Sequence, residues 1–197
     1  LAPKAVQPRV VHPCPSDFFI SSSPDEADVR LLRERLALNG KKVLLSVGRL
    51  VEGKGYQQLL ELFPRLLARF PNLCWVIIGT GPLETTVVER ARSLQIASAL
   101  RFIGVVPAER LRPFYALADV FVLLTHKTSH STEAWGTVFL EAAAAGIAVV
   151  AGTGGGVDEA VVHKKTGLVV DTDHPQEVIA SILNLLEDPL YASELGR

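Results

Sequence analysis

Six short apolar runs alternate with segments of helical period along the 197-residue chain, and this alternation constrains the fold more than any other feature. The runs are almost continuously apolar, as expected for strands of a parallel sheet that is covered on both faces. Between them, apolar residues recur at helical spacing, most clearly in 56–70. The runs lie at residues 43–48, 73–79, 100–104, 119–124, 147–152 and 167–170. The pattern predicts an α/β fold with a Rossmann-like, doubly wound parallel sheet of about six strands.

Local signals predict where two of the helices begin, end or bend. A helix is expected to begin after Ser23, with Glu26 completing a capping box, and to stop at Gly40. Pro64 falls inside the helical segment 56–70 and predicts a kink or a restart of the helix at that point.

The composition is that of a globular protein, and it argues against several functional classes. Hydrophobic residues make up 48% of the chain, and 20 Lys and Arg balance 21 Asp and Glu, for a net charge of −1. This balance argues against a general nucleic-acid-binding protein. No apolar run approaches the roughly 18 residues that span a bilayer. The two cysteines, Cys14 and Cys74, form no disulfide framework, which favours a reducing compartment.

The amino-terminal residues predict that the chain is part of a longer protein. It begins at Leu1, contains no Met, and lacks the charged and apolar regions of a signal peptide. Residues 1–22 are punctuated by proline and are expected to be extended, whereas 23–197 are expected to form one domain.

Two cations lie on a glycine-rich loop at the end of the first predicted strand. The loop 48–55 reads G-R-L-V-E-G-K-G, with Arg49 directly after the strand and Lys54 between two glycines. In a doubly wound sheet, ligands bind beyond the carboxyl ends of the strands. Glycines allow close backbone approach, and the cations suit a polyphosphate. A solvated loop is the alternative interpretation, and the loop does not match the G-x-x-x-x-G-K-[ST] motif of a P-loop.

Glycines also follow the second predicted strand. Residues 79–82 read G-T-G-P, which is similar to the start of a dinucleotide-binding fingerprint, but Glu84 stands where the third glycine would be. Taken by itself, the motif is more typical of a tight turn between a strand and a helix.

A pair of glutamates brackets the start of the helix expected after the fourth strand. Glu133 and Glu141 are eight positions apart, and Gly136 lies between them. The N–H groups of the first helical turn, around 136–138, would hold a diphosphate at the positive end of the helix dipole. A carboxylate accepts two hydroxyl hydrogen bonds, so Glu141 suits the vicinal diol of a ribose and Glu133 suits sugar hydroxyls. Alternatively, Glu133 caps the helix and Glu141 is a solvated helix residue.

These residues carry a resemblance to a known family. The segment 133–141, E-A-W-G-T-V-F-L-E, resembles the E-x7-E element of the retaining family 4 (group 1) glycosyltransferases, which have the GT-B fold. G-R-L-V-E-G-K-G is similar to the phosphate loop of that family, and I-I-G-T-G-P, R-F-I-G, A-D-V-F-V-L-L and G-G-V-D-E-A follow in the family's order. Ala134 and Trp135 depart from it, because Gly and Phe are commoner there. The order of the motifs makes the resemblance specific.

The resemblance implies that the chain is one half of a GT-B enzyme. Residues 1–22 would be the interdomain linker and 23–197 the Rossmann-like domain that binds the nucleotide sugar, with the amino-terminal acceptor domain absent. Arg49 and Lys54 would neutralise the diphosphate during catalysis, and Glu133 would hold the donor sugar. The implied donor-binding residues are Glu141 at the ribose, Gly136 and Thr137 at the phosphates, and Gly79, Gly81, Gly104 and Val105 around the base.

The implied function is donor binding for retaining, metal-independent transfer of a hexosyl group to a saccharide or lipid acceptor. Cations and a helix N-terminus already in place can stabilise the departing diphosphate without a metal. No cofactor is expected, because the nucleotide sugar is a substrate. No nucleic acid is expected as a partner either. The full-length enzyme would be cytoplasmic or peripheral at the inner face of the membrane, held there only by the missing domain. This chain alone is expected to bind the donor without transferring sugar.

Two other functions stay open on the sequence. One is a sugar-nucleotide epimerase or phosphorylase-like enzyme of the same fold, and the other is a catalytically silent nucleotide-binding module. The E-x7-E element together with Arg49 and Lys54 favours the transferase.

Two groups of potential metal ligands are interpreted as structural. Asp171 and Asp173 have the D-x-D spacing of some metal-dependent transferases, but they follow the last predicted strand, where a polar turn is expected. His126 and His130 precede a helix and lack a third ligand for zinc. The sequence therefore predicts no metal site.

Overall fold

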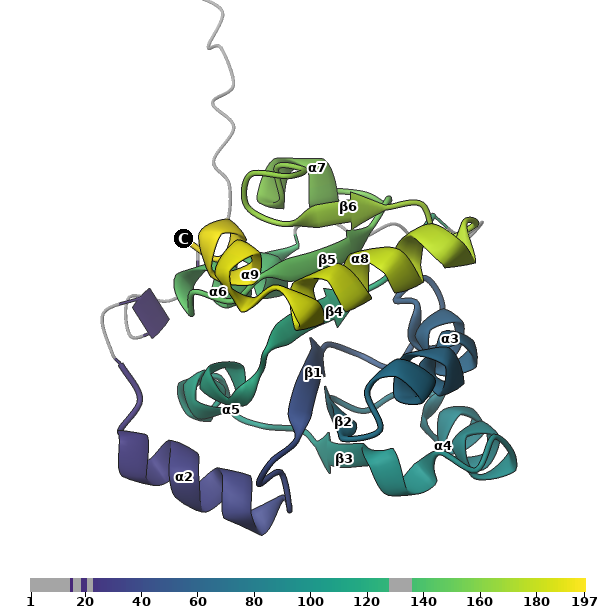
Figure 1. Ribbon diagram of the computed structural model, residues 1–197, viewed down its shortest axis with the longest axis horizontal. Coiled ribbons are helices and arrows are strands. Elements are labelled where there is room, and N and C mark those ends of the chain that lie inside the picture. The colour runs from purple at the N-terminus through teal and green to yellow at the C-terminus, as the bar shows by residue number, and fades with distance from the viewer. Residues whose placement is uncertain (1–14, 16–18, 21–22, 128–135) are drawn as a thin grey trace, which may run out of the picture.

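The protein folds around one parallel sheet, shown in the computed structural model in Figure 1. The structure describes residue 15 and residues 19–20, 23–127 and 136–197. The six strands, all paired in parallel in the order β3-β2-β1-β4-β5-β6, are β1 (Lys42–Val47), β2 (Leu73–Ile78), β3 (Leu100–Gly104), β4 (Val120–Leu123), β5 (Val149–Gly152) and β6 (Leu168–Val170). All six predicted strands are confirmed, and so is the Rossmann-like class of the fold.

Helices cover both faces of this sheet. They are α2 (Glu26–Arg35), α3 (Tyr56–Arg69), α4 (Glu84–Ser93), α5 (Arg112–Leu117), α6 (Thr137–Ala144), α7 (Val157–Ala160), α8 (Pro175–Glu187) and α9 (Pro189–Leu195), with short 3-10 turns η1 (Ala97–Ala99) and η2 (Ala108–Arg110). Figure 1 shows α3 and α4 on one side of β1 and β2, and α2 and α5 on the other. Within the described residues, no helix is both long enough and apolar enough to cross a membrane.

The strand order reverses at β1, which pairs with β2 on one side and β4 on the other. The chain leaves β1 toward β2 and leaves β4 toward β5, in opposite halves of the sheet, so the topological switch point lies between β1 and β4. Ligands of doubly wound sheets bind at such a switch point.

The ends of α2 lie a few residues from the predicted positions. Asp25, not Ser23, is the N-cap, and its carboxylate accepts the N–H of Ala27 at 2.8 Å. The helix ends at Arg35, before Gly40, because Ala37 adopts a φ of 53°. The N–H of Leu38 then donates to the carbonyl of Arg33 at 2.9 Å. This hydrogen bond belongs to a Schellman motif, here built without glycine.

Pro64 does not restart α3, so the predicted restart is wrong, whereas the kink stays a prediction. The helix is continuous from Tyr56 to Arg69 although proline removes one helical hydrogen bond. One face of α3 is buried along its length, through Tyr56, Leu59, Leu60, Phe63 and Leu66. Packing of such a face supplies most of the stability of a protein helix, and it outweighs the loss at Pro64.

A buried polar contact joins the three central strands. The hydroxyl of Ser46 on β1 donates to the carbonyl of Val122 on β4 at 2.5 Å, and the indole N–H of Trp75 on β2 donates to the same hydroxyl at 2.9 Å. Trp75 is fully buried and stacks on Tyr56 and Phe63 of α3. The contact therefore joins β1 to β4 on one side and to β2 on the other.

Substitution Ser46→Ala should lower the free energy of unfolding by about 1–3 kcal/mol, because the indole N–H of Trp75 stays buried without its acceptor. Urea unfolding measures this loss, and Ser98→Ala, at an exposed serine, is the control. The loss should be smaller when Ser46→Ala is made in a Trp75→Phe background. Equal losses in the two backgrounds would contradict the coupling.

Candidate functional site

Neighbouring loops at the carboxyl edge of the sheet touch through their backbones, at glycines that leave no room for a side chain. A methyl group at Gly79, after β2, would overlap the carbonyl oxygen of Gly48, after β1. The same holds for Gly81 against Leu50, Gly55 against Leu124 and Gly152 against Thr125. These four glycine contacts join the loops of β2, β1, β4 and β5 in the order of the strands in the sheet. The loops that carry the predicted site are thus held at fixed distances from one another.

The structure brings the two cations of the loop 48–55 close together. Arg49 is exposed, whereas Lys54 is partly buried. Burial lowers the pKa of Lys54, and the positive charge of Arg49 lowers it further. Two like charges repel each other, so an anion bound beside them would stabilise both. The loop therefore has the electrostatics of an anion site.

His126 holds this loop against the end of β4. Its backbone N–H donates to the carbonyl of Gly53 at 2.9 Å, between the two cations in the sequence. Its ring nitrogens lie 3.2 Å from the carbonyl oxygen of Leu124 and 3.3 Å from Nε2 of Gln58. The sequence indicates His126 only as a potential zinc ligand that lacks a third partner. Nothing in the spacing of the residues predicts its contact with the loop 48–55.

The second potential metal group is the polar turn that the sequence predicts. Asp171 accepts the N–H of Asp173 at 2.9 Å, and its other oxygen lies 2.9 Å from Nδ1 of His174. The backbone hydrogen bond is the main reason that the pKa of Asp171 is lowered. Over the part of the chain that the structure describes, no cluster of three or more His, Cys, Asp or Glu could hold a metal ion. His130 lies outside that part.

The start of α6 faces the same edge of the sheet. Gly136 is the N-cap with a φ of 58°, and no described side chain caps the helix. A methyl group at Gly136 would lie 3.0 Å from the ring of Phe139 and 3.2 Å from Ala160. The close approach and the left-handed backbone both favour glycine here. The first-turn N–H groups of Thr137 and its neighbour give this end a partial positive charge. Glu133 lies outside the described residues, so its predicted role stays a prediction.

Glu141 lies one turn into α6 and is partly buried. Its carboxylate accepts a hydrogen bond from the hydroxyl of Tyr115 at 2.7 Å. Burial raises the pKa of Glu141, and the hydrogen bond from Tyr115 acts in the opposite direction. Burial and then the charge of Glu141 raise the pKa of Tyr115. The carboxylate of Glu141 is therefore partly buried and held by Tyr115, and its interpretation as a solvated helix residue is wrong.

The residues expected around a base lie at the ends of β2 and β3. The N–H of Gly79 donates to the carbonyl of Gly104 at 2.8 Å, across an isolated bridge between the two strands. Val105 follows and is 75% exposed. It lines a groove together with Leu31 of α2 and Phe114 of α5. The structure thus brings Gly79, Gly104 and Val105 together, with Gly81 on the adjoining turn.

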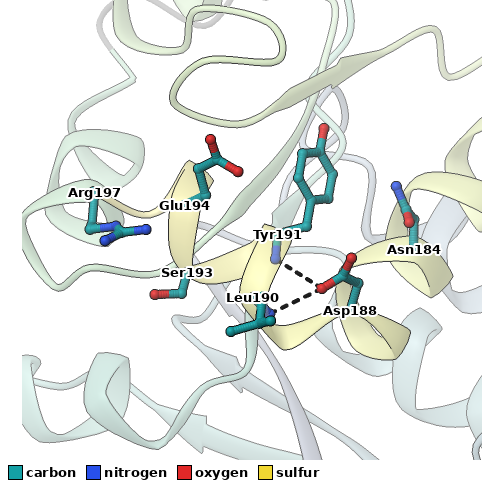
Figure 2. A pocket seen from close by; sticks show the side chains of 7 residues that line it. All are labelled: Asn184, Asp188, Leu190, Tyr191, Ser193, Glu194 and Arg197. Atoms are coloured by element: carbon teal, nitrogen blue, oxygen red, sulfur yellow. Dashed lines mark hydrogen bonds between the residues drawn. The ribbon is translucent and has the colours of Figure 1, made fainter.

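A separate pocket lies where α8 meets α9 (Figure 2). The carboxylate of Asp188 accepts the N–H groups of Leu190 and Tyr191 at 3.1 Å and 3.0 Å and so caps α9. The other side of this helix junction adjoins Lys42 and Ala148, at the amino ends of β1 and β5. The pocket is therefore associated with the edge of the sheet opposite the predicted site, and it holds none of the predicted residues.

Comparison with known families finds one match over most of the chain. A family model described as glycosyl transferases group 1 matches residues 28–197. This range includes every predicted site residue, among them the cations of the loop 48–55 and both glutamates.

A mannosyltransferase is similar in sequence to the chain. A GDP-mannose-dependent alpha-(1-6)-phosphatidylinositol monomannoside mannosyltransferase from Mycolicibacterium smegmatis is 36% identical over 176 residues. The match covers 88% of this chain and 46% of the relative. The chain thus spans about half the length of the curated relatives it matches.

Solved structures show the same fold. The Anabaena protein HepE, in complex with UDP and glucose, matches with a TM-score of 0.76 and 21% identity, over 88% of this chain and 46% of its own. The C-terminal domain of the group 1 family protein LpcC from Francisella tularensis matches with a TM-score of 0.74 and 20% identity, over 92% and 93% of the two chains. At these identities the likeness establishes the fold.

Substitution Glu141→Gln should raise the free energy of unfolding at pH 7. The raised pKa means that the folded protein holds the proton of Glu141 more tightly than the unfolded chain does. The contribution of this carboxyl to stability therefore falls as the pH rises through its folded pKa. Glutamine resembles the protonated acid, so the gain should vanish once the pH is below 4.5, the ordinary value.

Urea unfolding of the nucleotide-free protein at pH 7 and at pH 4 measures the difference. Glu109→Gln, at an exposed glutamate, is the matched control and should change stability little at either pH. A Glu141→Gln protein that is less stable than the parent at pH 7 would contradict the prediction.

Proposed function

Because the chain belongs to the group 1 glycosyl transferases, we propose that it is the domain of a hexosyltransferase that binds the nucleotide-sugar donor. The observation that carries this proposal is the arrangement at the switch point of the sheet. The paired cations leave β1, the N-terminus of α6 follows β4, and the contact of Gly55 with Leu124 holds the two loops together. A diphosphate between them would receive positive charge from both sides.

Arg49 and Lys54 bind the diphosphate in this proposal. Its negative charge relieves their mutual repulsion and raises the proton affinity of Lys54, which burial and Arg49 reduce in the free protein. The N–H groups at Gly136 and Thr137 complete the cradle. As the bond to the sugar breaks, negative charge grows on the departing nucleoside diphosphate, and these groups stabilise it in place. The reaction then needs no metal and no cofactor.

Glu141 binds the ribose of the donor, and the backbone around Gly79, Gly81, Gly104 and Val105 receives the base. Tyr115 occupies one carboxylate oxygen of Glu141, which leaves acceptor capacity on the group for a vicinal diol. The similarity to a GDP-mannose-dependent enzyme makes GDP the first nucleotide to test.

Transfer itself requires more than these residues. Glu133 is proposed to hold the donor sugar, and the configuration at the anomeric carbon is proposed to be retained. A second domain of the full-length enzyme would supply the acceptor, a saccharide or a lipid, in the cytoplasm or at the inner face of the membrane. The chain alone is then expected to bind the donor without transferring the sugar.

Calorimetric titration of the chain with GDP, UDP and ADP tests donor binding. The double variant Arg49→Ala/Lys54→Ala should bind the preferred nucleotide about 10- to 100-fold more weakly, because it loses charge-assisted contacts to the diphosphate. The unfolding midpoint should change little, since Arg49 is exposed and Lys54 only partly buried.

The matched control is Arg92→Ala/Lys165→Ala, which removes the same charge at exposed positions away from the loop. It should leave the affinity within about twofold of the parent, because distant surface charges are screened. If the folded parent binds none of the three nucleotides, the proposed function is wrong.

A further inference from the structure

Phe19 lies at the start of a series of contacts that leads to Glu141. It belongs to the predicted linker 1–22, yet its side chain is only 2% exposed. Its ring meets the ring of Tyr115 edge to face, with the centroids 5.3 Å apart and the planes at 88°. Such a contact contributes beyond the burial of apolar area, and it has a defined geometry. Phe19 is therefore seated on the residue that holds Glu141.

Arg112 holds Phe19 in this position from α5. Its guanidinium donates to the carbonyl of Phe19 at 2.6 Å and lies 5.0 Å from the centroid of its ring. The first contact fixes the backbone, and the second is a cation–π contact with the side chain. Arg112 and Tyr115 are three positions apart on α5, so one helix face carries both the clamp and its target.

Tyr115 transmits the position of Phe19 to the carboxylate. The tyrosine is fully buried, and its ring also stacks on Phe121 of β4 at a centroid distance of 5.7 Å. With Phe19 and Phe121 both against the ring, the hydroxyl has a fixed place. It lies 2.7 Å from Oε2 of Glu141 and 3.4 Å from the carbonyl of Val138. Removing Phe19 opens space beside the ring and loosens this hydrogen bond.

We propose that Phe19 is a positioning residue for the ribose of the nucleotide donor, acting through Tyr115 on Glu141. This inference rests on the proposed role of Glu141 in binding the ribose. In this proposal Phe19, which is 2% exposed, acts through Tyr115 and not by direct contact with the nucleotide. Its contact sets how well Glu141 is aligned with the two ribose hydroxyls, so the loss of the Phe19 side chain weakens the binding of the nucleoside. The grip of Arg49 and Lys54 on the diphosphate does not depend on it.

Two nucleotides that differ only in the ribose test this inference, with pyrophosphate as a ligand that has no ribose. The dissociation constants of GDP, 2′-deoxy-GDP and inorganic pyrophosphate are measured by calorimetry for the parent chain and for Phe19→Ala. If UDP or ADP binds more tightly than GDP, that nucleotide and its 2′-deoxy form replace the guanine pair. The parent should prefer the ribonucleotide about tenfold, as for a hydrogen bond to a charged group. In Phe19→Ala this preference should fall several-fold, with pyrophosphate binding unchanged within about twofold.

Two further variants separate positioning from general loss of stability. Tyr115→Phe removes only the hydroxyl and should lower the same preference, and adding Phe19→Ala to it should lower the preference no further. Phe70→Ala, at the partly buried C-cap of α3, is the matched control and should keep the parent's preference. Phe19→Leu, which keeps most of the buried volume, replaces Phe19→Ala if that variant does not fold.

The outcomes distinguish the two proposals. A parent that prefers the ribonucleotide, with a Phe19 variant that keeps the full preference, overturns the role of Phe19 and leaves the proposed function intact. A parent that binds the ribonucleotide and its 2′-deoxy form equally well, and also binds pyrophosphate, overturns the role of Glu141 and, with it, that of Phe19. A folded parent that binds none of the nucleotides overturns the proposed function as a whole, whether or not it binds pyrophosphate.

Discussion

Direct contact between backbones at the carboxyl edge of the sheet positions the loops that carry Arg49, Lys54, Gly79 and Gly81. The four glycine contacts bring loops from both halves of the sheet against one another, although the halves grow in opposite directions from β1. Without a side chain between them, the loops sit at van der Waals distance, and close packing resists any change of volume there. The loop that carries the cation pair is thereby packed against the end of β4 and against the turn that follows β2. The charged side chains of the proposed site are carried by this backbone arrangement.

Much of this fold can be predicted because its strands are buried on both faces. Continuous apolar runs such as 73–79, short and spaced between helical segments, are typical of strands in a covered parallel sheet. Cations that directly follow a strand indicate the carboxyl edge of the sheet, where ligands bind, and this prediction does not depend on how the side chains pack. Helix ends are harder to predict, because several residues compete for each role. Both Ser23 and Asp25 can cap a helix, and Ala37 ends one although Gly40 stands nearby. These choices depend on packing that a local pattern does not contain.

The contacts that hold Glu141 could not be predicted for a related reason. Tyr115 and Glu141 are 26 residues apart in the sequence, and Phe19 meets Tyr115 only once the chain is folded. Nothing in the spacing of a tyrosine on a short helix indicates a carboxylate partner. The burial that these contacts impose raises the pKa of Glu141, so the folded protein keeps a carboxylate where a neutral side chain would be more stable. A cost of this kind is common where a residue is retained for binding.

The glycine contacts also separate the requirements of folding from those of the proposed reaction. The cations that would meet the diphosphate stand on a scaffold that does not need them: Arg49 is exposed, Lys54 is only partly buried, and the core lies in the strands and the buried face of α3. Changes at such positions can abolish binding while the molecule keeps its shape and its melting temperature. High yield, a sharp thermal transition or an intact circular dichroism spectrum would then say nothing about whether a variant still binds the donor. Natural sequences of this fold can drift in the same way, keeping the architecture after the chemistry is lost.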